Sequence, residues 1–238
     1  YRNARRFRLK KGGRLYRIWG AGLDGTAYAP LSPEKKRSAR KRLGIGEQDF
    51  FLVSVGELNE NKNQEIVLQA MARLKERDVS GRIIRYGICG DGFFRERLQE
   101  QISLLGLEDA VTLFGYCREV REILGCADAS VFPSKREGLG MAALESLAMG
   151  VPVIASDNRG TREYMRCGEN GYVCDEHDAD GFAKAICLIM NQKEEERAKM
   201  KRRCVASVKP FLKENVTARM EKIYGFAKQR AEGKAYET

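Results

Sequence analysis

Residues 50–77 read FFLVSVGELNENKNQEIVLQAMARLKER, and this stretch decides the fold class. Its first seven residues form an unbroken apolar run of the length of a buried strand. Its second half, Gln64–Arg77, places apolar side chains on one helical face: Ile66, Val67, Ala70, Met71 and Leu74. A short polar loop separates the two halves. The stretch therefore predicts a strand, a loop and an amphipathic helix in immediate succession.

The same unit recurs along the chain. Further strand-like runs occupy residues 82–90, 110–115, 127–133 and 151–156. Helical patterns lie between or after them, over Phe93–Leu105, Arg118–Gly125 and Met141–Ala148. Alternation of nearly continuous apolar strands with helices is typical of an α/β fold with a parallel sheet covered on both faces. We expect five or six strands.

Beyond residue 178 the pattern becomes helical. Helices are predicted over Asp180–Met190, Glu194–Val208 and Glu214–Lys228, with Pro210 separating the last two. Residues 230–238 have the composition of a frayed tail. The chain is thus expected to have a helical C-terminal end.

The positive charge is concentrated at the start of the chain. The 238 residues carry 43 Lys and Arg against 33 Asp and Glu, a formal charge of +10, and 43% are apolar. This composition excludes a disordered chain, a collagen-like fibre and a coiled coil. Residues 1–25 hold eight basic residues and one acid, which is +7 of the +10. The remainder is nearly neutral, which weakens a general nucleic-acid-binding interpretation.

Cysteine and histidine usage argues against cross-links and metals. The seven cysteines are odd in number and include no C-x-x-C pair, and His177 is the single histidine. Neither a disulfide framework nor a zinc site is predicted. We expect free thiols in a reducing cytoplasm. No window approaches 18 apolar residues, and the basic start lacks the apolar region of a secretory signal.

In parallel sheets ligands bind at the carboxyl ends of the strands, so the loops there are the candidate sites. Residues 134–150, SKREGLGMAALESLAMG, place Gly138 and Gly140 at the start of a helix, where free amides and the helix dipole suit a phosphate. Glu137 and Glu145 could hold sugar or ribose hydroxyls. Alternatively, Glu137 only complements the helix dipole and Glu145 is a solvated helix residue.

Three other loops are weaker candidates. Lys62 follows the first strand beside a helix start, which favours an anion between them, although a solvated lysine is the alternative. Gly90-Asp91-Gly92 lacks the third glycine of a dinucleotide fingerprint, with Arg95 in that place, and is interpreted as a tight turn. Tyr116 could stack on a base or could be a core or surface aromatic residue.

Together these motifs resemble the C-terminal, nucleotide-sugar-binding domain of retaining GT-B "group 1" glycosyltransferases of bacterial capsule, exopolysaccharide and lipopolysaccharide assembly. The resemblance runs from about Phe51 to Ile186. The family pattern G-R-L-x-x-x-K-G corresponds to residues 56–63, and E-G-x-G with a second Glu eight residues after the first, followed by G-x-P-V, corresponds to residues 137–153. Glu57 departs from the usual arginine, and Asn63 from the usual glycine.

The resemblance implies one Rossmann-like half of a GT-B fold and a role for each matching residue. Lys62 would contact the donor diphosphate and Glu137 the hydroxyls of the transferred sugar, and these two would carry the catalysis. Glu145 would bind the nucleotide ribose and Tyr116 would lie at the base. The remaining donor-binding positions would be backbone: Gly56, Gly138, Leu139, Gly140 and Met141. The donor would be a UDP or GDP sugar, and no metal or other cofactor is expected.

The resemblance also implies a division of the chain. Residues 1–25 would be a basic linker and the end of an acceptor-binding N-terminal domain, residues 26–205 the donor domain, and residues 206–238 a helix packing back and a tail. The sugar would pass with retention to a glycan or lipid-linked acceptor, in the cytoplasm or at the inner face of the membrane. The isolated chain would transfer little.

Two alternatives stay open at this point. One is a GT-B-type sugar-nucleotide epimerase, against which the ordered pair Glu137 and Glu145 argues. The other is a binding module for RNA or anionic lipid led by the basic residues 2–17. For that arm we favour packing between domains or against a membrane surface, and we expect no nucleic-acid partner.

Overall fold

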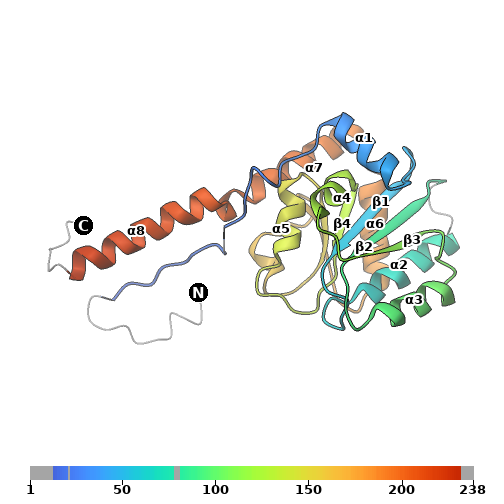
Figure 1. Cartoon of the computed structure of the whole chain (residues 1–238), viewed down its shortest axis with the longest axis horizontal. Coiled ribbons are helices and arrows are strands. Elements are labelled where there is room, and N and C mark those ends of the chain that lie inside the picture. The colour runs from blue at the N-terminus through green and yellow to red at the C-terminus, as the bar shows by residue number, and fades with distance from the viewer. Residues whose placement is uncertain (1–12, 21, 78–80, 232–238) are drawn as a thin grey trace. The chain divides into compact units, whose positions relative to one another are not determined.

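The computed structural model describes residues 13–20, 22–77 and 81–231 and divides the chain into two compact units. The larger unit is Thr26–Val208, and the smaller combines Tyr1–Gly25 with Lys209–Thr238. Figure 1 shows the strands and most of the helices in the larger unit. Each unit is described by itself below.

The larger unit is built on a six-stranded sheet in which all neighbouring strands are parallel. The strand order is β3-β2-β1-β4-β5-β6. Their bounds are β1 Phe50–Val55, β2 Ile84–Cys89, β3 Val111–Gly115, β4 Ala129–Phe132, β5 Val153–Ser156 and β6 Gly171–Cys174. Each of the five predicted apolar runs contains one strand, so the predicted parallel α/β architecture is confirmed.

Helices cover the sheet in two groups (Figure 1). Helix α2 packs against α3 and α6, whereas α1 packs against α4, and α5 against α7. Their bounds are α1 Pro33–Arg42, α2 Gln64–Arg77, α3 Arg95–Leu104, α4 Val120–Cys126, α5 Met141–Ala148, α6 Ala179–Met190 and α7 Glu194–Ser207, with a 3₁₀ turn, η2, at Thr161–Glu163. The predicted helices are confirmed with shifts of a few residues at their ends, and α1 is an additional helix.

The central strand β1 explains why the unit needs both helix groups. Its first five residues are all buried. Phe51 and Val53 point into one cluster with Leu124 and Cys126 of α4, while Phe50 and Leu52, which alternate with them, are buried toward the other face. Burial of one such side chain contributes about 1.5–3 kcal/mol. A strand that is apolar on both sides therefore requires cover on both sides.

The strand order reverses beside β1, which is where open parallel sheets bind their ligands. From β1 the chain builds outward through β2 to the edge strand β3, then returns to place β4 on the other side of β1. At such a reversal the loops that follow the two central strands diverge and leave a crevice at their carboxyl ends. The two loops concerned are residues 56–63 after β1 and residues 133–140 after β4.

The smaller unit contains a 3₁₀ turn, η3 Lys209–Phe211, and the long helix α8 Lys213–Ala231. Leu23 bridges to Leu212, and Trp19 contacts Phe211 edge to face with ring centroids 5.5 Å apart. The basic residues up to Lys11 and the tail beyond Ala231 lie outside the described residues. No helix within the described ranges is long and apolar enough to cross a membrane.

Candidate donor-binding site

An ion pair joins the two predicted catalytic residues, which lie in the loops that follow β1 and β4. Lys62 Nζ lies 2.5 Å from Glu137 Oε1. The side chains are 24% and 13% exposed, so both charges are largely withdrawn from water. Lys62 Nζ also lies 5.2 Å from the centre of the Phe132 ring, at the end of β4. An ammonium and a carboxylate thus face one another where a diphosphate and a sugar are expected.

Backbone contacts between the two loops fix this geometry. The amide of Lys135 donates to the carbonyl of Asn61 at 2.8 Å. The Asn61 side chain accepts from the amide of Arg136 at 3.1 Å and donates to its carbonyl at 3.0 Å. Lys135 also pairs with Glu60 at 3.0 Å. The loop carrying Lys62 and the loop carrying Glu137 are therefore joined immediately beside the ion pair.

Asn63 occupies a left-handed backbone position, with φ +55°. Glycine adopts this conformation most easily, and asparagine is among the few side chains that tolerate it. Asn63 Nδ2 donates to the carbonyl of Glu176 at 2.8 Å and to that of Pro133 at 3.3 Å. The asparagine in place of glycine therefore keeps the turn and ties it to two other loops.

The start of α5 is open to an anion. Gly140 precedes the helix with φ +86°, and its amide-rich turn has no side-chain cap. A Cβ at Gly140 would lie 2.8 Å from the Phe132 ring and 2.9 Å from the Tyr164 hydroxyl, whereas one at Gly138 would meet nothing within 4 Å. Only a residue without a side chain fits at Gly140, so the chain turns tightly and presents the first amides of α5.

Glu145 lies within α5 and is half-buried. Burial raises its pKa, and a hydrogen bond from the Tyr28 hydroxyl partly offsets this rise. Glu145 is therefore not the solvated helix residue of the alternative interpretation, and Tyr28 is its hydrogen-bond partner. Tyr28 precedes α1 and could not be paired with Glu145 from sequence, because no spacing relates two residues 117 positions apart.

A third loop, after β5, packs against the backbone of Glu137. A Cβ at Gly160 would lie 2.9 Å from the Glu137 carbonyl oxygen, so the two backbones are in close contact. Asn158 shapes this loop by accepting from the amides of Gly160 and Thr161 at 3.0 and 3.1 Å and by donating to the Ser134 carbonyl at 2.9 Å. Asn158 and Thr161 are absent from the predicted site.

The remaining predicted residues differ in how far they are exposed. Gly56 directly follows β1 and lies beside Lys62, since a Cβ there would lie 3.3 Å from the lysine Cε. Leu139 is half-buried and Met141 is 36% exposed at the start of α5. Tyr116 is 81% exposed in the loop after β3. The Glu57 carboxylate is exposed and accepts from Asn59 Nδ2 at 2.9 Å.

The Gly90-Asp91-Gly92 turn lies against the β1 loop. A Cβ at Gly90 would lie 1.9 Å from the Gly56 carbonyl oxygen, and one at Gly92 would lie 2.4 Å from the Leu58 carbonyl oxygen. Both glycines therefore permit a close approach of two backbones. The interpretation of this motif as a tight turn agrees with that packing.

Comparison with known proteins identifies the larger unit. Residues 35–204 match the model of the family described as glycosyl transferases group 1. The putative glycosyltransferase EpsD of Bacillus subtilis is 39% identical over 185 residues, which is 78% of this chain and 48% of that protein. The lipopolysaccharide core biosynthesis glycosyltransferase LpsE of Rhizobium meliloti is 34% identical over 58% of this chain and 39% of its own length.

Solved structures share the fold. A crystal structure of Anabaena HepE in complex with UDP superposes with a TM-score of 0.79 and 23% identity, over 90% of this chain and 59% of HepE. The C-terminal domain of the group 1 glycosyl transferase LpcC of Francisella tularensis superposes with a TM-score of 0.67 and 19% identity, over 79% of this chain and 96% of that domain.

The chain spans about half the length of the curated relatives that it matches. The family match covers most of the unit that carries the parallel sheet, the crevice and the Lys62–Glu137 pair. This chain belongs to the group 1 glycosyl transferase family.

Proposed function

We propose that this chain is the donor-binding half of a retaining glycosyltransferase that takes a nucleotide-diphosphate sugar of the UDP or GDP type. The observation that carries the proposal is the ion pair of Lys62 and Glu137, 2.5 Å apart at the mouth of the crevice and beside the uncapped start of α5. Two opposite charges withdrawn from water at a ligand-binding edge suit a ligand that carries both phosphate and hydroxyl groups.

In the proposed mechanism the donor diphosphate takes the place of the Glu137 carboxylate beside Lys62. The ammonium and the first amides of α5 then hold the phosphate oxygens, and they stabilise the negative charge that develops as the nucleoside diphosphate leaves. Preorganised charges of this kind contribute about 3–4 kcal/mol to a transition state. Glu137, released from the lysine, accepts hydrogen bonds from the sugar hydroxyls.

The nucleotide end of the donor is assigned to the other predicted residues. Glu145 would accept hydrogen bonds from the ribose hydroxyls, and Tyr116 would lie at the base. The likeness to HepE, whose crystal structures include complexes with UDP and with UDP-glucose, supports a nucleotide-sugar ligand. No metal ion takes part in this mechanism.

We propose that the acceptor binds outside the region matched here, because the relatives are about twice as long as that region. A glycan or a lipid-linked sugar is the proposed acceptor, and the names of relatives in lipopolysaccharide core and colanic acid biosynthesis support that class. The proposed location is the cytoplasm, at the inner face of the membrane, and no nucleic acid is a partner.

Isothermal titration calorimetry with UDP and with GDP tests donor binding. We expect the chain to bind at least one of them. Lys62→Ala should weaken that binding by about 2–3 kcal/mol, because it removes a hydrogen bond to a charged group and leaves the phosphate oxygen without its donor. Lys184→Ala is the matched control, because Lys184 is exposed on α6 and lines a cavity to which neither loop contributes a residue. Absence of binding to both nucleotides, or equal effects of the two substitutions, would overturn the proposal.

Retention needs a product assay on a protein that also contains the acceptor domain. We expect NMR of the product to show the anomeric configuration of the donor sugar on the acceptor. An inverted anomer would disprove retention while leaving donor binding intact. Release of an epimerised nucleotide sugar with no transfer would replace the transferase proposal by an epimerase.

A further inference from the structure

Helix α1 is a second concentration of positive charge, separate from the start of the chain. Its ten residues include six basic residues and one acid. Residues 1–25 hold eight of the 43 basic residues and one of the 33 acids, which leaves 29 basic and 31 acidic residues for the rest of the chain. Apart from these two segments the chain is therefore slightly acidic, and α1 stands out within the larger unit.

A cavity of about 810 Å³ opens beside α1, the segment after it and the start of α7. This volume is typical of small-molecule sites. Six basic side chains line it against two acids, Glu47 and Asp128; the basic residues are Lys36, Arg37, Arg40, Lys41, Arg82 and Arg197. The lining thus has an excess of four positive charges, contributed by three separate segments.

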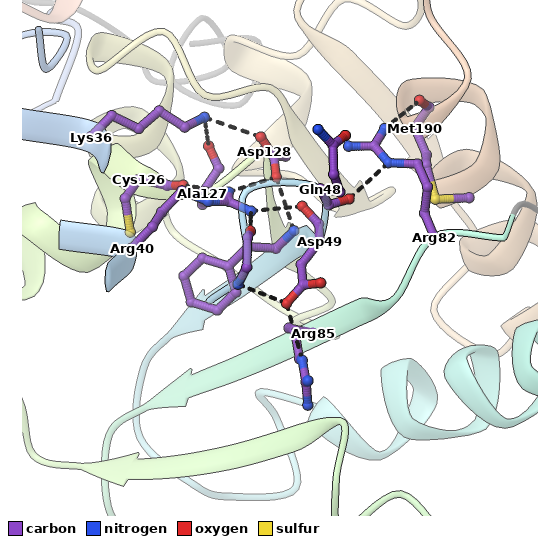
Figure 2. A network of polar contacts seen from close by, with 12 residues as sticks. Lys36, Arg40, Gln48, Asp49, Arg82, Arg85, Cys126, Ala127, Asp128 and Met190 are labelled. Carbon is purple, nitrogen blue, oxygen red and sulfur yellow. Dashed lines mark hydrogen bonds and ion pairs between the residues drawn. The ribbon is translucent and has the colours of Figure 1, made fainter. Parts of the chain in front are cut away.

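Arg40 forms the buried part of this lining and is only 6% exposed (Figure 2). Its Nη1 donates to the carbonyl of Cys126 and to Asp128, and its Nη2 donates to the carbonyls of Gly46 and Asp49. Its Nε is buried and has no hydrogen-bond partner among the described residues. Four hydrogen bonds thus fix the Arg40 guanidinium as a buried positive charge in the cavity lining, and its Nε–H is the unused donor.

Asp128 does not cancel the positive charge of the cavity. Figure 2 shows Lys36 and Arg40 both reaching its carboxylate, at 3.0 and 2.9 Å. Burial favours a higher pKa for Asp128, but these two cations and the Phe51 amide outweigh it and lower the pKa. One carboxylate is thus shared between two cations and balances only one of their two charges.

Arg37 and Lys41 form the exposed rim, one helical turn apart on α1. In the part of the chain that the structure describes, neither side chain makes an ion pair or a hydrogen bond. Like charges at this spacing repel each other. The helix dipole stabilises Lys41 in the last turn but not Arg37 in the middle of the helix. An anion between the two would relieve this repulsion.

We propose that this cavity binds a phosphate-bearing anion with at least two negative charges. The site is distinct from the proposed donor site, because Asp49 and Asp128 precede β1 and β4, whereas the donor loops follow those strands. The phosphate belongs either to a soluble phosphorylated molecule or to a lipid headgroup. The inference does not depend on the proposed glycosyl transfer.

Titration of the isotopically labelled full chain with inorganic pyrophosphate, followed by NMR, tests the site. We expect saturable shifts of the amides of α1 and of residues 45–49, with at least a tenfold loss of affinity in Arg37→Glu/Lys41→Glu and a smaller loss in Arg37→Gln/Lys41→Gln. The matched control is Lys184→Glu/Lys199→Glu, which changes the net charge equally at two exposed lysines of a different cavity. Its affinity should stay within twofold of the parent chain.

A second arm distinguishes the two sources of phosphate. The parent chain and two double variants, Arg37→Glu/Lys41→Glu and the control Lys184→Glu/Lys199→Glu, are floated with vesicles of phosphatidylcholine containing 30% phosphatidylglycerol, and with phosphatidylcholine alone. Selective loss of flotation in Arg37→Glu/Lys41→Glu supports a lipid headgroup, whereas unchanged flotation with a selective loss of pyrophosphate binding supports a soluble ligand. Pyrophosphate shifts confined to the donor loops, or an equal loss of affinity in both double variants, would overturn the proposal.

Discussion

At the scale of one residue, the environment of the Glu145 carboxyl group disfavours its charged form. It is half-buried in an otherwise apolar helix, burial raises its pKa, and the Tyr28 hydroxyl is its hydrogen-bond donor. The sequence of α5 places this acid among apolar residues, MAALESLA. Tyr28 could not be predicted, because its position depends on the packing of a segment from a distant part of the chain.

We expect Glu145→Gln to raise the free energy of unfolding at pH 7 by about 0.5–1 kcal/mol, within the range of ordinary stabilising substitutions. The folded-state pKa lies above its usual value of 4.5, so the stabilising contribution of the protonated group is present below pH 4.5 and is lost as the pH rises through the folded-state pKa. Glutamine keeps an acceptor for Tyr28 without the charge. Chemical denaturation at pH 7 and pH 4 measures the difference, which should shrink at pH 4.

Tyr28→Phe is the control for this interpretation. In the parent chain it removes the hydrogen-bond donor from a half-buried carboxylate and should cost about 1 kcal/mol. In Glu145→Gln the loss should be smaller, because the remaining acceptor is neutral. A Glu145→Gln chain that is less stable than the parent at pH 7 would show that the charge itself is stabilising.

At the scale of elements, helices with an apolar face could be predicted from the sequence. A helix whose position depends on contacts with other segments could not. The bounds of α2 and α5 follow directly from their apolar faces. The sequence does not predict helix α1, because PEKKRSARKR has no apolar stripe; only Ala39 and Arg40 of this helix are buried. Its signals were Ser32 as N-cap and Pro33 at the first helical position, which mark a helix start but do not predict its length.

The start of α5 gives a prediction with an internal control. Gly140→Ala places a Cβ 2.8 Å from the Phe132 ring at φ +86°, so strain and a clash combine. We expect it to cost about 2–4 kcal/mol of stability, from about 1–2 kcal/mol of left-handed backbone and a comparable packing penalty. Gly138→Ala, two residues earlier, meets nothing within 4 Å and should change stability by at most about 0.5 kcal/mol. Thermal unfolding of both variants measures the two losses of stability. Equal losses would contradict the described turn at Gly140.

At the scale of the whole molecule, the larger unit is the part of the chain that should fold alone. Residues 26–208 contain all six strands, both helix groups and both donor loops. The prediction of a parallel α/β fold from sequence is confirmed, and it was possible because the strands are apolar on both faces. The sequence could not show which cations of the nearly neutral remainder gather into one cavity, since α1, Arg82 and Arg197 meet only in the fold.

We expect a fragment of residues 26–208 to unfold in one cooperative transition and to bind the nucleotide preferred by the full chain within about threefold of its affinity. Differential scanning calorimetry with and without nucleotide measures both properties, because a ligand that binds the native state raises its Tm. A fragment that shows no cooperative transition would contradict an independent larger unit. A folded fragment without nucleotide binding would place part of the donor site in the smaller unit.

The central claim is that a diphosphate replaces Glu137 as the partner of Lys62, and the affinity of Glu137→Gln for the preferred nucleoside diphosphate tests it most directly. Without a sugar, Glu137 contributes only a competing carboxylate 2.5 Å from the lysine. Its neutralisation should therefore tighten binding of UDP or GDP by about threefold to tenfold, or about 0.7–1.4 kcal/mol, in the same titration in which Lys62→Ala weakens it. Binding of Glu137→Gln that is weakened to the level of Lys62→Ala would contradict the exchange of partners and with it the proposed position of the diphosphate.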